Sequence, residues 1–240
     1  QQRLPTRRRA RDRPRYPLRP FGTMPREAGC RRIYRSHAVR RRRSVLAVLL
    51  AVVLALIVIA AAPGVGGKPV KVTYDRRAAA AYADHWALKV NSAYWSSPNN
   101  DCANFVSQCL AAGGLRPTAD AGCEWRADGA DFPTLAWVNC EAQKRALSQR
   151  SATHSRYIVA VSREVPSDWA AGDVVYLGNR VHGCVEWQHV IICVGRRGGE
   201  FVYDSHTNAR KRRRLGHWYP AHFSEVRFCR IADVVSYEQR

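Results

Sequence analysis

Apolar residues are concentrated in one long run near the start of the chain. Val45–Ala62 is an uninterrupted stretch of 18 Val, Leu, Ile and Ala residues, and four arginines, Arg40–Arg43, stand just before it. A basic flank followed by such a run predicts one helix that is either a transmembrane anchor or a secretory signal. The arginines should stay inside the cell. We therefore expect a single-pass membrane protein with its domain outside, or a secreted protein if the segment is cleaved.

Helical spacing follows a Gly-rich stretch, residues 63–72, which we interpret as a linker. The segment from Tyr74 to Trp95 is rich in alanine and long enough for one helix. A second helix is predicted to begin at Cys102 and to end at Gly113-Gly114, because glycine pairs stop helices. Its apolar residues recur three and four positions apart, at Phe105, Val106, Cys109 and Leu110.

Strand-like segments dominate the last third of the chain. Residues 115–150 first show no clean period and predict an irregular insertion, in which Trp125 and Trp137 are expected to pack rather than to stack on a ligand. Four predicted strands follow, at Gly172–Leu177, His189–Gly195, Glu200–Thr207 and Val226–Ile231. Arg196–Gly199 predicts a hairpin turn. Helices first and an antiparallel sheet after them predict a layered α+β domain over residues 73–235.

Charge matters mainly for the N-terminal segment. Residues 1–44 hold 16 basic and 2 acidic residues, which accounts for +14 of the net charge of +20. They cannot bury a core and are expected to be disordered, with translation expected to start at Met24. Arg210–Arg214 supplies most of the remaining charge and predicts a solvated basic loop, or alternatively a contact for an anionic wall polymer or a membrane surface. A basic tail and one cluster argue against a specific nucleic-acid binder.

Of the eight cysteines, Cys30 precedes the apolar run and the other seven follow it. Export would place the other seven in a compartment that permits disulfides. An odd number leaves at least one thiol unpaired, and a reactive cysteine would explain it. Cys123 and Cys140 flank one insertion and are the first disulfide that we expect, whereas Cys109 is expected in the core.

Cys102 is the strongest candidate for chemistry. It stands at the start of the predicted helix, where the positive end of the helix dipole stabilises a thiolate. His189 begins a predicted strand after the loop 183–188 and could take a proton from a thiol on a facing helix. On the next strand, Asp204 and His206 share one face, and either could orient the imidazole of His189. This order of groups follows the logic of a papain-like hydrolase.

Several sequence blocks together carry a resemblance to a known family. The most specific block is Asp101–Gly114, which reads DCANFVSQCLAAGG. Looser blocks lie at Tyr74–Tyr94, Trp125, Gly172–Val175, His189–Ile192 and Ser205–Asn208. With them, Val72–Tyr219 resembles the bacterial putative amidase domain family, which looks like a member of the papain-like group that contains the NlpC-type and CHAP-type cell-wall hydrolases. Ala103 departs from the threonine expected in this block.

The resemblance implies a papain-like or NlpC-like fold, with N-terminal helices packed on an antiparallel sheet. It also implies Cys102 as nucleophile and His189 as general base. The implied third polar residue is His206, with Asn208 and Asp204 as rivals.

Further groups around the nucleophile are candidates for positioning the substrate. The backbone N–H of Cys102 is the natural oxyanion donor. Asp101 and Asn104 are expected to shape the turn before the helix, with a role in orienting the carbonyl as the alternative.

The implied activity is that of an exported cysteine amidase or peptidase that acts on cell-wall peptide through an acyl-enzyme. No cofactor is implied. No metal is expected, because neither Cys184 with His182 nor His217 with His222 has the tight repeated spacing of a zinc site. A non-catalytic wall-binding module on the same scaffold is the alternative. A nucleic-acid-associated protein is a further one, which the apolar segment disfavours.

Overall fold

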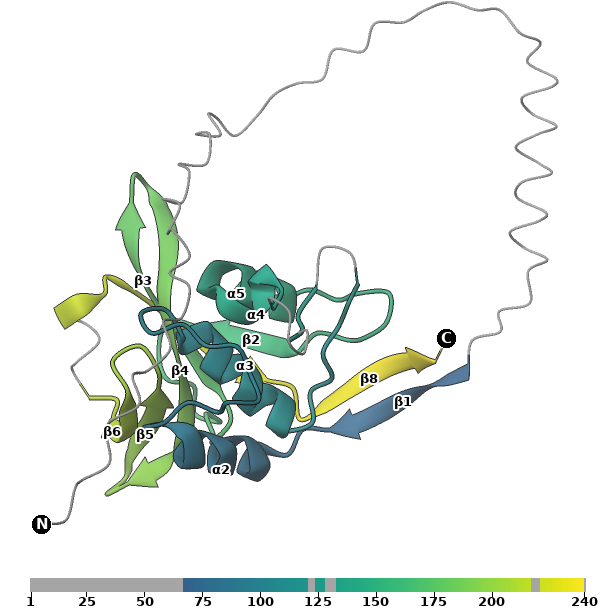
Figure 1. The fold of residues 1–240 in the computed structure, drawn as a ribbon, viewed down its shortest axis with the longest axis horizontal. Helices are drawn as coiled ribbons and strands as arrows, with labels where there is room; N and C mark the ends of the chain where they lie inside the picture. The colour runs from purple at the N-terminus through teal and green to yellow at the C-terminus, as the bar shows by residue number, and fades with distance from the viewer. Residues whose placement is uncertain (1–66, 121–123, 128–132, 217–220, 240) are drawn as a thin grey trace, which may run out of the picture. The chain divides into compact units, whose positions relative to one another are not determined.

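Figure 1 shows the computed structural model of the chain, which describes residues 67–120, 124–127, 133–216 and 221–239. The predicted basic segment, 1–44, and the predicted membrane or signal segment, 45–62, lie outside the described residues. Among the described helices, none has the length and apolar character needed to cross a bilayer. The described residues form an α+β domain with antiparallel sheets, as predicted.

Helices occupy the first half of the domain. They are α2 (Arg76–Trp86), α3 (Cys102–Ala112), α4 (Leu135–Val138) and α5 (Cys140–Ser148). The prediction for α3 is confirmed at both ends, since it begins at Cys102 and Gly113 follows its last residue. However, every residue of α3 from Cys102 to Leu110 is buried, so the helix has no solvent face over that length. It lies between the sheet and the other helices, which explains why its sequence is so apolar.

The first helix is shorter than predicted. Instead of running from Tyr74 to Trp95, α2 ends at Trp86. Beyond it the backbone N–H of Lys89 turns back to the Trp86 carbonyl at 3.0 Å. The Asn91 side chain then accepts from the N–H of Ala93, also at 3.0 Å. Local side-chain hydrogen bonds of this kind compete with helix formation. The alanine-rich composition of the segment predicts a longer helix because it does not reveal this competition.

The main sheet contains six antiparallel strands in the order β2-β7-β3-β4-β5-β6. Their bounds are Ile158–Ser162 for β2, Val174–Val181 for β3, Cys184–Arg197 for β4, Glu200–Ser205 for β5, Arg210–Arg214 for β6 and Glu225–Ile231 for β7. The four predicted strands correspond to β3, β4, β5 and β7. β4 starts at Cys184, so the predicted loop 183–188 is mostly strand and His189 lies within β4. The predicted basic loop is the edge strand β6, whose residues are all exposed.

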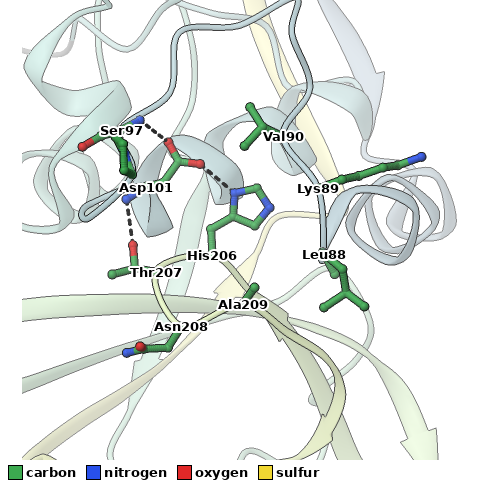
Figure 2. A pocket seen from close by; sticks show the side chains of 11 residues that line it. Leu88, Lys89, Val90, Ser97, Asp101, His206, Thr207, Asn208 and Ala209 are labelled. Carbon is green, nitrogen blue, oxygen red and sulfur yellow. Dashed lines mark hydrogen bonds and ion pairs between the residues drawn. The ribbon is translucent and has the colours of Figure 1, made fainter.

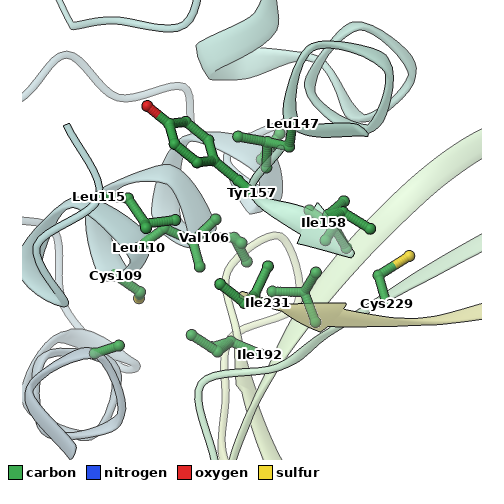
Figure 3. Packing of buried hydrophobic residues seen from close by; sticks show 14 of the residues in the cluster. Val106, Cys109, Leu110, Leu115, Leu147, Tyr157, Ile158, Ile192, Cys229 and Ile231 are labelled. Carbon is green, nitrogen blue, oxygen red and sulfur yellow. The ribbon is translucent and has the colours of Figure 1, made fainter. Parts of the chain in front are cut away.

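The two faces of the sheet bury different sets of side chains. One face of β3 and β4 carries Val174, Tyr176, Val190 and Ile192 toward the helices. Figure 3 shows Val106 and Leu110 of α3 in the same cluster as Ile192 and Ile231. Alternate residues of the same strands form a second cluster with Trp169 and Phe228. This alternation fixes the register of β4, and therefore the direction in which its side chains point.

A two-stranded sheet joins the two ends of the described chain (Figure 1). β1 (Gly67–Thr73) pairs antiparallel with β8 (Val234–Gln239), with Val72 opposite Val235. The predicted linker is therefore wrong for its described part, residues 67–72. The glycines and prolines around this segment indicate a linker and obscure the alternation of Val70 and Val72. The strand could not be recognised locally, because its partner strand lies at the other end of the domain.

The six described cysteines are all free thiols: Cys102, Cys109, Cys140, Cys184, Cys193 and Cys229. The predicted Cys123–Cys140 disulfide is therefore wrong, and Cys123 itself lies outside the described residues. The sulfur of Cys140 instead lies 3.5 Å from that of Cys102. Cys109 is fully buried in the core, as predicted.

Candidate active site

Cys102 is the first residue of α3 and is only 1% exposed. The first N–H groups of a helix have no partner within the helix, so their positive ends face whatever lies before the first turn. A thiolate at this position gains from the helix dipole. The sequence prediction that Cys102 occupies a helix N-terminus is confirmed.

His189 lies against Cys102 because α3 packs across β4. The neighbouring imidazole of His189 helps to lower the pKa of the Cys102 thiol. The register of β3 with β4 shifts between Leu177 and Gly178, which leaves an additional residue in β4 just before His189. A side chain on Gly178 would collide with the carbonyl of Glu186, so this irregularity depends on glycine. Such bulges turn a strand locally and re-aim the next side chain.

Cys140 is the site residue that sequence reasoning missed. Like Cys102, it is the first residue of a helix, and Asn139 caps that helix by accepting from the N–H of Ala142 at 3.0 Å. The N-termini of α3 and α5 therefore lie next to each other, with the sulfurs of Cys102 and Cys140 in contact. The available signal was the repeated pattern of an Asp or Asn followed by cysteine at a helix start, in Asp101-Cys102 and Asn139-Cys140.

The two thiols are electrostatically unequal. The pKa of Cys102 is lowered well below that of an ordinary thiol, chiefly by the hydrogen bond from Cys140. Burial opposes this shift, while His189 and the backbone N–H of Val190 reinforce it. The hydrogen bond to Cys102 and burial raise the pKa of Cys140. These opposite shifts favour Cys140 as the donor and Cys102 as the acceptor of the hydrogen bond between the two sulfurs.

A buried amide holds α5 against α3. Nε2 of Gln143 donates to the carbonyl of Ala103 at 2.7 Å and to the Ser107 hydroxyl at 2.6 Å. Oε1 of Gln143 accepts from the Tyr176 hydroxyl at 2.9 Å. Because Gln143 follows Cys140 by less than one turn, this bracing fixes the approach of the two sulfurs.

Asp101 precedes Cys102 and connects it to its surroundings. Its Oδ1 accepts from the N–H of Ser97 at 3.1 Å and from Nδ2 of Asn104 at 2.8 Å. Its backbone N–H donates to the Thr207 hydroxyl at 2.7 Å. Asp101 makes no capping bond to its own helix. The carboxylate thus holds the loop before α3.

His206 meets Asp101 on the turn after β5, as Figure 2 shows. Its Nδ1 lies 2.6 Å from Oδ2 of Asp101, and its Nε2 lies 2.9 Å from the Trp86 carbonyl. The ring stacks on Phe105 with centroids 4.1 Å apart. Both ring nitrogens are thus occupied by groups other than His189. Burial disfavours the imidazolium, but the hydrogen bonds to Asp101 and Trp86 outweigh it and raise the pKa of His206.

Asn104 has a fully engaged amide. Its Nδ2 donates to the Trp95 carbonyl at 2.7 Å as well as to Asp101, and its Oδ1 accepts from Nε1 of Trp137 at 2.9 Å and from Gln108 at 3.1 Å. These contacts favour the turn-shaping role over direct contact with a carbonyl. Trp137 is 1% exposed and packs within the protein, as predicted.

The rival third residues, Asp204 and Asn208, differ from each other in their surroundings. Asp204 is fully buried, and its Oδ1 accepts from the N–H of Arg212 at 2.5 Å. Burial raises the pKa of Asp204 to about 6. Asn208 has a left-handed backbone, with φ of 73°, and lines the cavity beside His206.

That cavity measures about 200 Å³ and opens beside Asp101 rather than beside Cys102. Figure 2 shows Leu88, Lys89 and Val90 across from His206. Leu88 and Val90 are 68% and 54% exposed, so the rim offers apolar contacts at the edge of the candidate site.

Within the described ranges, no three His, Cys, Asp or Glu side chains gather closely enough to hold a metal ion. His217, one of the metal ligands considered from sequence, lies outside those ranges.

Comparison with known proteins gives this geometry a context. The sequence matches the family described as "Putative amidase domain" over residues 73–225, which include Cys102 and His189. It is also 30% identical over 140 residues to "Uncharacterized protein YhbB" of Bacillus subtilis (strain 168). That alignment covers 55% of this chain and 42% of the relative, so the chain matches less than half of the relative's length. No solved structure matches the chain.

Proposed function

The chain belongs to the putative amidase domain family, and on that premise we propose that it is a cysteine-dependent hydrolase of amide bonds. The observation that carries the proposal is the environment of Cys102. Its thiolate is favoured by a helix N-terminus, by the Cys140 thiol and by His189, which are the conditions that activate a nucleophilic cysteine.

In this proposal His189 takes the proton of the Cys102 thiol, the sulfur bonds to the amide carbon, and the carbonyl electrons move onto oxygen. The backbone N–H of Cys102, at the start of α3, is the proposed oxyanion donor. The intermediate collapses as His189 gives a proton to the leaving nitrogen and the carbon–nitrogen bond breaks. Water, deprotonated by His189, then attacks the thioester, releases the acid and restores the thiol.

His206 takes a positioning role in this proposal. Its contact to Asp101 holds the residue just before the nucleophile, and it acts through that carboxylate rather than by touching His189. The cysteine on a helix and the histidine on an antiparallel strand support a papain-like relationship, which we also propose.

We further propose that the domain acts outside the cell on cell-wall peptide, tethered or exported by residues 45–62. The support is the arginine-flanked apolar run in the sequence. Fold and family by themselves do not name the substrate.

A non-catalytic wall-binding module remains the second candidate function. It is favoured by one observation: Cys102 is 1% exposed, and the cavity nearby opens beside Asp101 and His206 instead. Binding of cell-wall peptide without turnover would be its signature.

Turnover separates the two. We expect the purified protein to cleave amide bonds in cell-wall stem peptides. Mass spectrometry of the products measures this cleavage. Cys102→Ser and His189→Ala should each reduce kcat/KM by about 10³-fold or more. Cys184→Ser is the matched control, because that thiol is exposed. Wild-type turnover in Cys102→Ser would rule out the proposed nucleophile.

A further inference from the structure

Two free thiols meet in the candidate site. The sulfurs of Cys102 and Cys140 are 3.5 Å apart, and both residues are buried, at 1% and 5% exposure. Each is the first residue of its helix, and Gln143 ties the second helix to the first. Of the six cysteines that the structure describes, these are the two whose sulfurs lie in contact.

We propose that Cys102 and Cys140 form a reversible disulfide when the protein meets a hydroperoxide, and that this modification blocks the nucleophile. A disulfide requires a sulfur separation of about 2.05 Å. The sulfurs must therefore close by roughly 1.5 Å. Both sulfurs lie on the first residues of their helices, so rotation of the two side chains changes their separation.

The chemistry divides the roles between the two cysteines. The Cys102 thiolate attacks one oxygen of the peroxide, the oxygen–oxygen bond breaks, and the departing hydroxide takes up a proton to become water. The Cys140 sulfur then attacks the sulfenic acid of Cys102. A sulfur–sulfur bond forms, the sulfur–oxygen bond breaks, and the oxygen leaves with the Cys140 proton as a second water. The peroxide gains the two electrons that the thiols lose.

The reduced state favours this order of events. The lowered pKa of Cys102 makes it the thiol that reacts first, and the raised pKa of Cys140 keeps its proton on the resolving sulfur. A neighbouring thiol captures the sulfenic acid before it is oxidised irreversibly.

The loss of activity rests on the proposed function, whereas the disulfide itself does not. The full-length protein, reduced and then freed of reductant, is treated with hydrogen peroxide and digested without reductant for peptide mapping. We expect a linked peptide that contains Cys102 and Cys140, loss of amide hydrolysis, and recovery of both the thiols and the activity on treatment with dithiothreitol.

Cys140→Ala provides the decisive comparison. Without a resolving thiol, prolonged peroxide should drive Cys102 to sulfinic and sulfonic acids, which dithiothreitol does not reverse. Cys184→Ser is the matched control and should still give the linked peptide, because that thiol is exposed and outside the pair. If Cys140→Ala does not fold, as judged by circular dichroism, the linked peptide in the wild type decides alone.

Two results would overturn the proposal: sulfinic acid at Cys102 of the wild type with no linked peptide, or full recovery of Cys140→Ala under dithiothreitol after prolonged peroxide. The two proposals also fail separately. A linked peptide in a protein without turnover would contradict the hydrolase proposal and support the disulfide proposal. Turnover that peroxide abolishes without a linked peptide would contradict the disulfide proposal and support the hydrolase proposal.

Discussion

Asp101 is the residue on which the geometry of the candidate site depends. Its carboxylate receives the N–H of Ser97, the amide of Asn104 and the imidazole of His206, while its backbone N–H is held by Thr207. The residue before Cys102 is thus fixed from the loop, from its own helix and from the turn after β5. Positioning of this kind keeps a nucleophile in one geometry without touching the substrate.

Replacing His206 by alanine should expose how much this network contributes. The change leaves a carboxylate that is 5% exposed without its imidazole partner, and it removes the ring stacked on Phe105. We expect the free energy of unfolding at pH 6 to fall by about 2–4 kcal/mol, measured by urea titration. His85→Ala is the matched control on exposed helix surface and should change it by less than about 0.5 kcal/mol.

The same pair should give stability a characteristic pH dependence. The pKa of His206 is raised in the fold, so its stabilising effect is complete below the unfolded value of about 6.5 and is lost as pH rises through the folded value. The gap in free energy of unfolding between wild type and His206→Ala should therefore narrow as pH increases above about 6.5. A gap that widens over that range would contradict the assignment.

At the scale of elements, local patterns predicted what local interactions determine. α3 could be located because its apolar spacing and its Gly113-Gly114 stop lie within one segment. β3, β5 and β7 followed from strand-like runs. The start of β4 could not be located, because polar residues on its exposed half, from Cys184 to Gln188, look like a loop until β3 pairs with them.

β1 and β8 illustrate the opposite case, since each is defined only by the other. The pairing leaves Val235 fully buried, whereas the adjacent Val234 is 49% exposed. These neighbouring valines are matched in sequence position and strand propensity, so they separate burial from local preference.

Val235→Ala should lower the free energy of unfolding by about 1–3 kcal/mol, because it deletes buried methyl groups and leaves a cavity. Val234→Ala, the control, should cost less than about 1 kcal/mol, mainly through strand propensity. Thermal or urea unfolding of the two variants measures the difference. Equal losses would mean that β8 does not pack on the domain as described.

At the scale of the whole molecule, the candidate site is assembled from distant segments. Cys102 and Cys140 are 38 positions apart, and Asp101 and His206 are 105 apart. Sequence could nominate Cys102, His189 and His206 by residue type and local setting. It could not determine which of them meet, because that depends on how α3 and α5 pack across β4.

Cys140 shows the limit most clearly. Counting cysteines under the assumption of export assigned it to a disulfide with Cys123, whereas packing of α5 on α3 brings it to Cys102. Residue counting treats thiols as interchangeable, but the environment at each helix start lowers the pKa of Cys102 and raises that of Cys140.

The central claim is that Cys102 is an activated thiol, and its alkylation rate by iodoacetamide as a function of pH tests it most directly. Mass spectrometry would follow Cys102 and the exposed Cys184 in the same sample, in wild type and in His189→Ala. We predict an apparent pKa for Cys102 well below the ordinary thiol value of about 8.5, and a profile that shifts when His189 is removed. A Cys102 profile that coincides with that of Cys184, or that His189→Ala leaves unchanged, would contradict the account.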